Sequence, residues 1–503
     1  MLKVINNLLS KTGIVVIFLI LLIVPTFSRM LKPGIYSMQD FHFFRLFEFN
    51  KCIEAGEIPC RWAPDAGLGY GEPLFNFYGQ FTYAVGEVFH LVGFSLIDSL
   101  KLLFILSLLG SGISMFFLAK RIWKNNPASI LSAILYVYAP YRAVDVWVRG
   151  ALPEAFSFLI LPLIILYIDK YLEDKKVKDI LIFSGLTSIL IITHNLSFVM
   201  FLPVIVLWSI YKLYINRNWK LLFNILFSLL ISFLLSAFYV LPVIYESKFI
   251  DIASTTVGYF DYRAHFVTIK QLFLSHYWGY GGSTWGDEDG LSLAVGYMQW
   301  IIPAIIAAWI LITNKLKVSK DFLILLFIGF IFLILTHNKS TFLWNNIPGM
   351  AYIQFPWRFL GVATFCLALS SGYVFNLFKK NSILLLISLV VVTLVINLNL
   401  FKEDIWYEVN DTYFTSGLEW DRQRTASIGD YWPKLGHEIP SVPSDGTYIN
   451  YFPGWVGQES GKKGLILAEG AEFTNTPVRR VGNAISLFAI FGVTFYLIKR
   501  WKD

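Results

Sequence analysis

The sequence is poor in charged residues and in cysteine. Only 15% of its 503 residues are charged, whereas 56% are hydrophobic and 17% are aromatic. Soluble domains are about 45–50% apolar, so this composition excludes a soluble protein and indicates an integral membrane protein. The three cysteines are too few for a disulfide scaffold or a structural zinc site. Cys52 and Cys60 share one polar loop, where they either pair, if the loop faces an oxidising compartment, or stay free thiols.

The first apolar run, which begins at Gly13, is not followed by a small-x-small cleavage site, so we interpret it as a retained membrane span. Further apolar runs of roughly 16–25 residues are long enough to cross a hydrocarbon core of ~30 Å. They predict an all-α polytopic membrane protein with about 12 transmembrane helices. The runs begin near residues 13, 98, 127, 155, 179, 196, 219, 297, 321, 358, 382 and 483.

Lysine and arginine concentrate in every second connection between these runs. By the positive-inside rule these connections and both termini are cytoplasmic, in a plasma-membrane protein that crosses the bilayer many times. This distribution explains the net charge of +7 without a nucleic-acid partner. The remaining connections face outward and comprise 30–97, 142–154, the turn at His194, 246–296, 337–357 and 401–481.

Three regions follow from this topology. Residues 1–400 form a transmembrane domain with a long first outer loop at 30–97, in which the segment from Pro73 is interpreted as an amphipathic interfacial helix. Residues 401–481 form a small extracytoplasmic module, which short alternating runs broken by Gly and Pro predict to be β-rich. Residues 482–503 form the last transmembrane helix and a cytoplasmic tail.

The predicted spans contain essentially no charged residue. Intramembrane charges mark transport pathways, and a transporter needs polar groups near the midplane, so their scarcity disfavours a transporter. Polar side chains gather instead at the outer ends of the spans, where a cavity suits an enzyme that works on a lipid headgroup. They are Asp40, His42, Arg45, Arg61, Arg142, Asp145, Arg149, Glu154, His194, His276, His337 and Arg358.

Structural roles are the alternative for the residues after the first span. The pattern Ser37-x-x-Asp40 fits a capping box, in which Asp40 closes the N-terminus of a helix. His42, Arg45 and Glu48 recur at helical spacing and fit the polar stripe of a helix that lies on the membrane surface.

The other arginines and the histidine turns have structural alternatives too. Arg142, Arg149 and Arg358 fit anchors that reach toward lipid phosphates. The turns "THNLS" (193–197) and "THNKS" (336–340) fit the end of one helix followed by the N-cap of the next, with the Asn and Ser of each turn as capping residues.

Convergence of arginines and histidines on one face favours a phosphate site over these alternatives. Arginine supplies planar bidentate donors for phosphate, and a carboxylate can deprotonate an incoming hydroxyl. Asp40 is the acid at the membrane edge of the first loop, so it is the candidate base.

Several stretches together resemble a known superfamily. An Asp directly after the first span, in a large outer loop of interfacial helices, resembles the GT-C superfamily of membrane glycosyltransferases, which use polyprenyl-phosphate-linked sugars. A wider set of motifs is similar to the bacterial membrane proteins called 6-pyruvoyl-tetrahydropterin-synthase-related, or YfhO-like. The motifs are "DFHFFRLFEFNKCIEAGEIPCRWAPDAGLGYGEPLFNFYG", "VRGALPEAFSF", "THNLS", "QFPWRFLG", "DYWPKLG", "YINYFPGWVG" and "FTNTPVRRVGNAISLFA". The resemblance implies a GT-C-like fold with Asp40 in the general-base position.

The resulting hypothesis is an inverting glycosyltransferase with an extracytoplasmic active site and a polyprenyl-phosphate-linked sugar as donor. Asp40 takes the proton from an acceptor hydroxyl, and His42 and Glu154 orient that site. The residues predicted to bind the donor phosphate are Arg149, Arg358, His194, His337 and Arg142. The residues predicted to line a sugar or acceptor loop are Arg61, Tyr70, Asn76 and Tyr78.

Two rival classes remain, a lipid or polysaccharide transporter and a noncatalytic envelope-assembly scaffold. The acceptor is a glycan, a lipid or a protein, and neither the sugar nor the oligomeric state is predicted. No metal site is assigned. Asp40 and His42 with an acid of "GDEDG" (286–290) nevertheless leave a divalent cation open as a cofactor.

Overall fold

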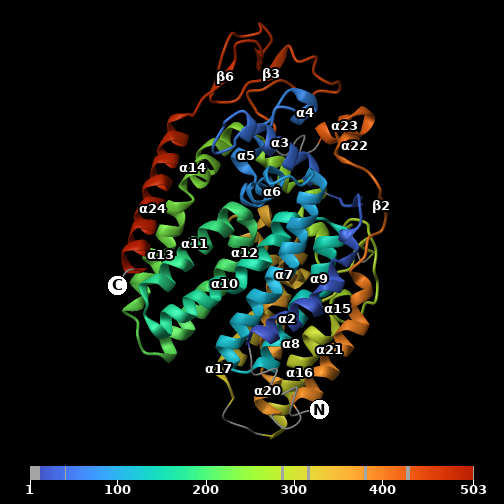
Figure 1. Ribbon diagram of the computed structural model, residues 1–503, viewed down its shortest axis with the longest axis vertical. Coiled ribbons are helices and arrows are strands. Elements are labelled where there is room, and N and C mark those ends of the chain that lie inside the picture. Colours follow the sequence, from blue (N-terminus) through green and yellow to red (C-terminus); the bar gives the residue numbers. More distant parts are fainter. Residues whose placement is uncertain are drawn as a thin grey trace.

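The computed structural model describes residues 12–39, 41–284, 288–313, 318–378, 382–425 and 431–501, which are mainly helical (Figure 1). The helices that follow the predicted apolar runs, with α14 directly after α13, are α2 (Thr12–Ile23), α7 (Leu96–Trp123), α8 (Asn126–Val137), α10 (Leu152–Asp174), α11 (Val177–Thr193), α12 (Asn195–Ile215), α13 (Leu221–Leu235), α14 (Ala237–Glu246), α16 (Tyr297–Thr313), α17 (Lys320–Thr336), α19 (Phe359–Ser371), α21 (Ser382–Asn397) and α24 (Pro477–Trp501). The other α-helices of the described residues are α3 (His42–Glu54), α4 (Ala66–Gly69), α5 (Leu74–Phe77), α6 (Phe81–Leu91), α9 (Pro140–Ala143), α15 (Ile269–Phe273), α18 (Thr341–Asn346), α20 (Val374–Leu377), α22 (Asp411–Phe414) and α23 (Gly417–Arg424). The strands are β1 (Ile35–Tyr36), β2 (Trp406–Tyr407), β3 (Tyr448–Asn450), β4 (Trp455–Val456), β5 (Leu465–Leu467) and β6 (Glu472–Phe473).

Among the described residues, 6 helices are long and apolar enough to cross a membrane, or up to 8 if each of two bent helix pairs is one span. The 6 are Leu96–Trp123, Leu152–Asp174, Asn195–Ile215, Pro356–Leu377, Ser382–Leu400 and Pro477–Lys499. A helix begins near each predicted start. Several of these helices, α2, α8 and α16 among them, are shorter than a span, so the predicted count of twelve is not confirmed.

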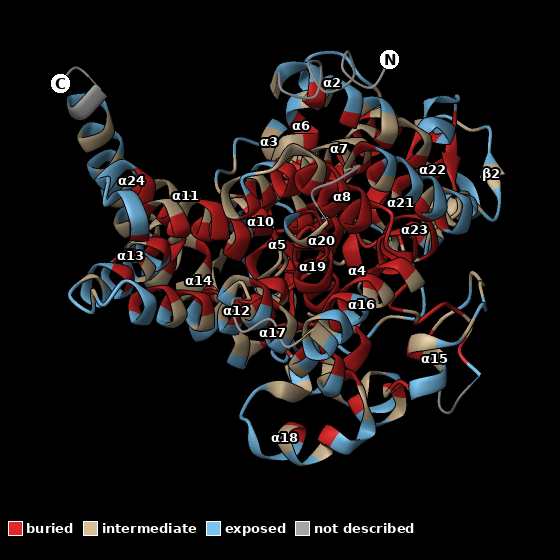
Figure 2. Cartoon of the chain, turned by 90° about the horizontal axis from the view of Figure 1, so that it is seen from below, coloured by how far each residue is buried: buried red, intermediate tan, exposed pale blue. Residues whose placement is uncertain are grey.

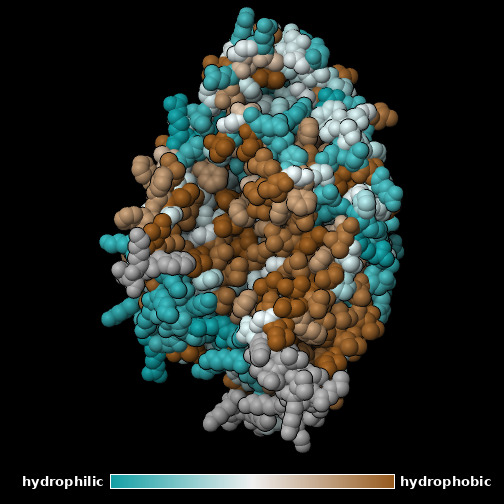
Figure 3. Space-filling model, viewed as in Figure 1, coloured by the Kyte–Doolittle hydropathy of each residue, from teal (hydrophilic) through white to brown (hydrophobic). Residues whose placement is uncertain are grey.

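The helices pack around a buried centre. α7 packs against α8 and α10, and α19 packs against α8 and α17. Figure 2 shows α10 and α19 within this buried centre, whereas α24 stands at the edge and is largely exposed. Figure 3 shows a broad apolar belt across the middle of the molecule, with polar residues gathered above it. The chain is therefore a polytopic helical membrane protein.

The first loop folds as short helices over one end of this bundle, with α3 packed against α6 and α7. Arg45 Nη1 donates to the Tyr78 hydroxyl at 3.2 Å, and Glu48 Oε2 accepts from the backbone N–H of Asp65 at 3.0 Å. Both Arg45 and Glu48 are buried. The interpretation of these two residues as a polar stripe at the membrane surface is therefore wrong, because the polar face of α3 packs against polar groups of its own loop.

Ser37 does not cap α3, as the capping-box alternative for this segment would require. α3 begins at His42, with Phe41 at its N-cap position. The N–H of Ser37 donates to the carbonyl of Ile405 at 2.8 Å, and Ser37 Oγ accepts from the N–H of Ile405 at 3.2 Å. Ser37 thus joins the chain to residues far along the sequence instead of capping α3. Asp40 lies outside the described residues.

The polar region 401–481 is joined to the first loop and to the bundle. β2 pairs antiparallel with β1. The Asp411 carboxylate accepts from the backbone N–H groups of Leu96 and Ile97 at 2.8 and 3.1 Å, so it caps the first turn of α7. β3 pairs with β5 and β4 with β6. Each of these strands has only two or three residues, and the predicted β-rich character is not confirmed.

Cys52 and Cys60 form a disulfide, which is the paired alternative of the two that the sequence left open. Glu57 lies between them in the chain, and burial raises its pKa from 4.5 to about 7, although the Arg61 and Arg479 guanidiniums act in the opposite direction.

Glu57 should make the folded protein less stable as the pH rises. A carboxyl with a raised pKa in the folded state holds its proton there, so its contribution to stability is present below pH 4.5 and is lost as the pH rises toward 7. We expect Glu57→Gln to remove this loss and to raise the thermal midpoint at pH 8, relative to wild type, by roughly a few °C. The two proteins should differ little at pH 4.5. A difference that is equal at both pH values would contradict the titration of Glu57.

Candidate active site

The chain between α8 and α10 forms the centre of the candidate site. After α9, residues Val144–Val148 form one π-helical turn, an irregularity that is frequent at functional sites. The next turn contains Gly150, which has a φ of +61°, and a Cβ added there would lie 2.6 Å from Met38 Cβ. Gly150 therefore permits a left-handed backbone and a close approach of the segment that precedes α3.

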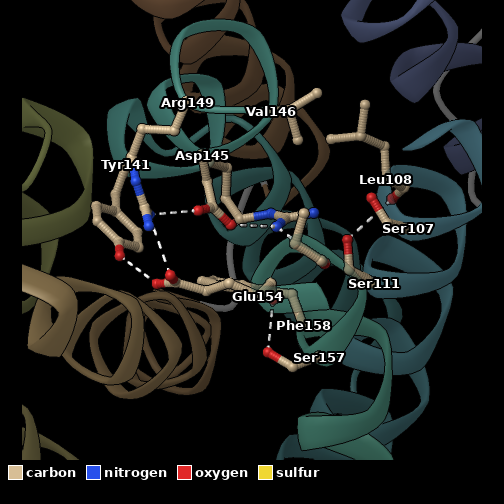
Figure 4. Close-up of polar contacts among 12 residues, drawn as sticks. Ser107, Leu108, Ser111, Tyr141, Asp145, Val146, Arg149, Glu154, Ser157 and Phe158 are labelled. Carbon is tan, nitrogen blue, oxygen red and sulfur yellow. Dashed lines mark hydrogen bonds and ion pairs between the residues drawn. The ribbon is translucent and has the colours of Figure 1, made fainter. Parts of the chain in front are cut away.

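Four side chains of this region form a buried polar network (Figure 4). Arg149 Nη1 donates to Asp145 Oδ1 at 2.7 Å and to Glu154 Oε2 at 3.0 Å. The Tyr141 hydroxyl donates to the other carboxylate oxygen of Glu154. Asp145 is 0% exposed and Glu154 is 3% exposed. The two carboxylates therefore hold the Arg149 guanidinium in one orientation.

Two further arginines surround this network. Arg142 Nη1 lies 3.7 Å from Asp145 Oδ2, and Arg358 Nε lies 3.7 Å from Glu154 Oε2. With Arg149, the cluster holds three guanidiniums against two carboxylates, a net charge of +1 when both carboxylates are ionised. An excess of positive charge in a cluster that is largely shielded from water favours binding of an anion.

His194 lies beside this cluster at the junction of α11 and α12. Its Nδ1 shares a hydrogen bond of 2.7 Å with Ser197 Oγ, and the Ser197 and Ser157 hydroxyls share a hydrogen bond of 3.1 Å. Ser157 lies one turn after Glu154 on α10 and donates to its carbonyl at 2.6 Å. Burial lowers the pKa of His194 to about 4, so the imidazole is neutral at pH 7 and the net positive charge comes from the arginines.

A cavity of about 160 Å³ opens beside Arg149. The guanidinium lies over the ring of Trp357, 4.7 Å from its centroid. Both hydrogen bonds of this side chain use Nη1, and within the described residues Nε and Nη2 make none. These donors are available to an anion in the cavity. The other lining residues are Gln39, Ala151, Tyr259, Ser283, Leu291 and Phe355.

His42 acts on the site through the backbone of α10. Its Nε2 accepts from the N–H of Leu152 at 3.0 Å, so a neutral imidazole carries its proton on Nδ1, which lies 2.6 Å from the Tyr83 hydroxyl. The side chain is fully buried. His42 thus fixes the first turn of α10, two residues before Glu154, and does not line the cavity.

Arg61 and Asn76 lie in a separate buried cluster with Glu246 and Arg479. Arg61 Nη1 donates to Asn76 Oδ1 at 3.3 Å, and Asn76 Nδ2 donates to Glu246 Oε2 at 2.8 Å. Arg479 Nε donates to the same carboxylate oxygen at 3.0 Å, and Arg479 Nη2 lies 2.9 Å from it. This cluster joins the first loop, α14 and α24, and the structure does not bring Arg61 or Asn76 to the Arg149 cavity.

Tyr70, Tyr78 and His337 are not among the residues that line the Arg149 cavity either. His337 Nδ1 accepts from the backbone N–H of Lys339 at 3.2 Å and caps the short turn Asn338–Ser340. The expectation of a capped turn is met here, with the histidine rather than the asparagine or serine as the cap.

Three residues that build the site have no role assigned from the sequence: Tyr141, Asp145 and Trp357. The i,i+4 spacing of Asp145 and Arg149 was available as a signal for their ion pair. Trp357 directly precedes Arg358 in the chain, but its ring lies against the guanidinium of Arg149. Nothing in the sequence predicts that contact.

The sequence assigns no metal site but leaves a divalent cation open as a cofactor. Within the described residues, no group of three or more His, Cys, Asp or Glu side chains could hold a metal ion. Asp40 and Asp287 lie outside the described residues. Asp289 accepts hydrogen bonds from Ser283 Oγ at 2.9 Å and from Gln271 Nε2 at 2.7 Å.

No family model and no curated protein matches the sequence, so membership of the YfhO-like group is not confirmed. Among solved structures, the chain is similar to the arabinofuranosyltransferase AftD from Mycobacteria, with 12% identity and a TM-score of 0.47 over 81% of this chain and 28% of that chain. It is also similar to the oligosaccharyltransferase of Archaeoglobus fulgidus. For the apo form the identity is 12% and the TM-score 0.43, over 84% of this chain and 56% of that chain. For the complex with zinc and sulfate the values are 10% and 0.41, over 87% and 59%. The chain thus spans 28% to 59% of the length of these proteins, and both names describe sugar transferases.

Proposed function

We propose that this chain is a membrane glycosyltransferase that moves a sugar from a polyprenyl-phosphate-linked donor to an acceptor on the outer face of the membrane. The observation that carries the proposal is the excess positive charge of a cluster of three arginines, one of which, Arg149, lines a cavity. A phosphate leaving group is an anion that matches this charge, and guanidinium groups bind phosphate through two parallel hydrogen bonds. The resemblance of the sequence motifs to the GT-C superfamily supports the same activity.

The proposed reaction is a single displacement at the anomeric carbon of the donor sugar, which inverts its configuration. The acceptor oxygen forms the new bond while Asp40 takes its proton, and the bond from the anomeric carbon to the phosphate oxygen breaks with its electron pair leaving on the phosphate. Arg149 and Arg358 stabilise that negative charge. Glu154 positions Arg149, and His42 positions the helical turn that carries Glu154.

We also propose that the site is extracytoplasmic and that both termini are cytoplasmic. The distribution of Lys and Arg supports this orientation. The Cys52–Cys60 disulfide lies in the first loop, and such bonds are typical of oxidising compartments. The module 401–481, which is joined to that loop, is the part proposed to contact the acceptor. The YfhO-like assignment rests on the motifs alone.

The variant Arg149→Lys tests the phosphate role. Lysine keeps the positive charge but loses the planar pair of donors and the stacking on Trp357. We therefore expect kcat/KM for the lipid-linked donor to fall about 10–100-fold with little change in the thermal midpoint. The measurement is release of polyprenyl phosphate by the full chain in nanodiscs, supplied with a panel of polyprenyl-phosphate sugars and with cell-envelope extract as acceptor. Arg263→Lys is the control, because Arg263 is 65% exposed and pairs with Asp261 at the surface.

Two outcomes would replace the proposal with a rival class. Movement of the lipid-linked sugar across a vesicle membrane, without transfer, would identify a transporter. Envelope glycans that are unchanged by mass spectrometry, both without the protein and after joint loss of Arg149 and Arg358, would favour a noncatalytic scaffold.

A further inference from the structure

A second cavity is lined by other residues of the segment that precedes α3. It has a volume of about 220 Å³ and lies between residues 35–43 and the helices α22 and α23. Its lining residues are Ile35, Tyr36, Ser37, Met38, Phe41, Phe43, Tyr407, Tyr413, Phe414, Glu419, Arg422 and Gln423. We call it the α23 pocket. The proposed reaction assigns no role to the residues of this pocket.

Gln423 gives the α23 pocket an unsatisfied polar atom. This side chain is 2% exposed, and its Nε2 donates to Glu419 Oε1 at 2.7 Å. Its Oε1 is buried and has no hydrogen-bond partner within the part of the chain that the structure describes. A buried amide oxygen without a donor is costly, and a ligand hydroxyl in the pocket would supply that donor.

The rest of the lining suits a sugar ring. Tyr407 and Tyr413 are 39% and 44% exposed, so they offer aromatic faces to a ligand that combines apolar C–H faces with hydroxyls. The charged lining residues among those described are Glu419 and Arg422, which pair with each other at 2.5 and 2.8 Å. Their charges cancel, unlike those beside Arg149, so the pocket favours a neutral ligand.

The position of the α23 pocket relates it to the first cavity. Gln39 lines the Arg149 cavity, whereas Phe41 lines the α23 pocket. The candidate base Asp40 stands between these two residues in the sequence. The Arg422 guanidinium lies 4.9 Å from the centroid of the Phe41 ring. The segment that precedes α3 therefore contributes side chains both to the Arg149 cavity and to an aromatic pocket whose charged residues pair with each other.

We propose that the α23 pocket binds a neutral, hydroxyl-rich sugar residue of the acceptor, so that the acceptor is a glycan. That the bound sugar belongs to an acceptor rests on the proposed function. Binding of the sugar can be tested without any transfer reaction. The Gln423 amide oxygen accepts a bond from a sugar hydroxyl, the Tyr413 ring stacks on the sugar face, and the Glu419–Arg422 pair contacts further hydroxyls.

The test is binding of methyl glycosides of glucose, galactose and mannose to the full chain in nanodiscs, measured by saturation-transfer NMR, with methyl glucuronide as the anionic counterpart. We expect at least one neutral glycoside to bind, and we expect its Kd to rise at least about tenfold in Gln423→Leu and in Tyr413→Ala. Leu418→Ala is the matched control, because Leu418 lies on the same helix, is 88% exposed and does not line the pocket. A thermal midpoint that is unchanged in Gln423→Leu separates lost binding from lost folding.

Three results would overturn the inference: no neutral glycoside binds wild type, the glucuronide binds as tightly as the neutral sugars, or both pocket variants keep the wild-type Kd. The transfer assay distinguishes this failure from failure of the proposed function. If wild type transfers sugar and Gln423→Leu keeps its KM for the acceptor, the pocket assignment falls and the enzyme stands. If neutral glycosides bind as expected but no transfer occurs, the pocket stands and the enzyme falls.

Discussion

Replacing Asp40 with Asn is expected to slow sugar transfer by about 10²–10⁴-fold, the range that a general base contributes. Asparagine keeps the shape of the side chain and still accepts hydrogen bonds through its amide oxygen, but it cannot take a proton from the acceptor hydroxyl at neutral pH. Protein level and binding of the lipid phosphate should therefore survive, because the arginines proposed to hold the phosphate are unchanged. Single-turnover rates with saturating lipid-linked donor isolate this chemical step from binding.

A matched variant for this experiment is Glu54→Gln, which neutralises an exposed acid at the far end of α3 and should transfer at the wild-type rate. If Asp40→Asn retains full activity, Asp40 is not the base, and another acid or a bound water must take the proton. If Asp40→Asn loses binding of the lipid phosphate as well as transfer, its role is structural.

The part of the site that the sequence predicts best is the stretch "YRAVDVWVRGALPEA". Its arginines and Glu154 are close in the chain, so one turn of backbone brings them together in the structure. The sequence also predicts that Arg358 and His194 lie near this stretch. Successive membrane helices run in opposite directions, so every second connection lies at the same end of the bundle. Both residues do lie at the Arg149 cluster, since Arg358 contacts Glu154 and His194 is bonded through two serines to α10.

Other residues could not be placed because their partners are distant in sequence. Arg61 and Asn76 belong to a cluster with Glu246 and Arg479, which follow more than 160 residues later. The residues adjacent in sequence do not distinguish an arginine that pairs within such a cluster from one that contacts a ligand. The burial of Glu48 was missed for a related reason, because helical spacing shows which residues share a face but not whether water or a polar loop covers it.

The same limit applies to membrane spans and strands. Apolar periodicity located the helices, but span length depends on where each helix breaks, and two bent pairs turn by 77° and 91°. In the region 401–481, alternation suggested strands, whereas short runs between frequent turns leave only two- or three-residue pairings.

Truncation of Glu246 is expected to cause a large loss of stability, about 3–5 kcal/mol for Glu246→Ala. Glu246 is 1% exposed, and Arg479, its ion-pair partner, is 0% exposed. Removing the carboxylate leaves a buried guanidinium without its ion-pair partner and also removes the acceptor of Asn76. The free energy of unfolding of the full chain in mixed micelles measures this cost. Because the cluster joins α24 to the first loop, hydrogen exchange should rise first in α24.

Two further variants make this prediction specific to burial. Glu173→Ala removes an acid that pairs with Arg121 at 2.8 Å but is 42% exposed, and it should cost less than about 1 kcal/mol. Replacing both partners, with Glu246→Met and Arg479→Met together, removes the unpaired charge and should recover much of the loss, because apolar side chains of similar volume substitute well for a buried ion pair. Two results would contradict this explanation. They are an equal loss of stability in Glu246→Ala and Glu173→Ala, and a double variant that is no more stable than Glu246→Ala. Either one would mean that the loss in Glu246→Ala does not come from a buried unpaired charge.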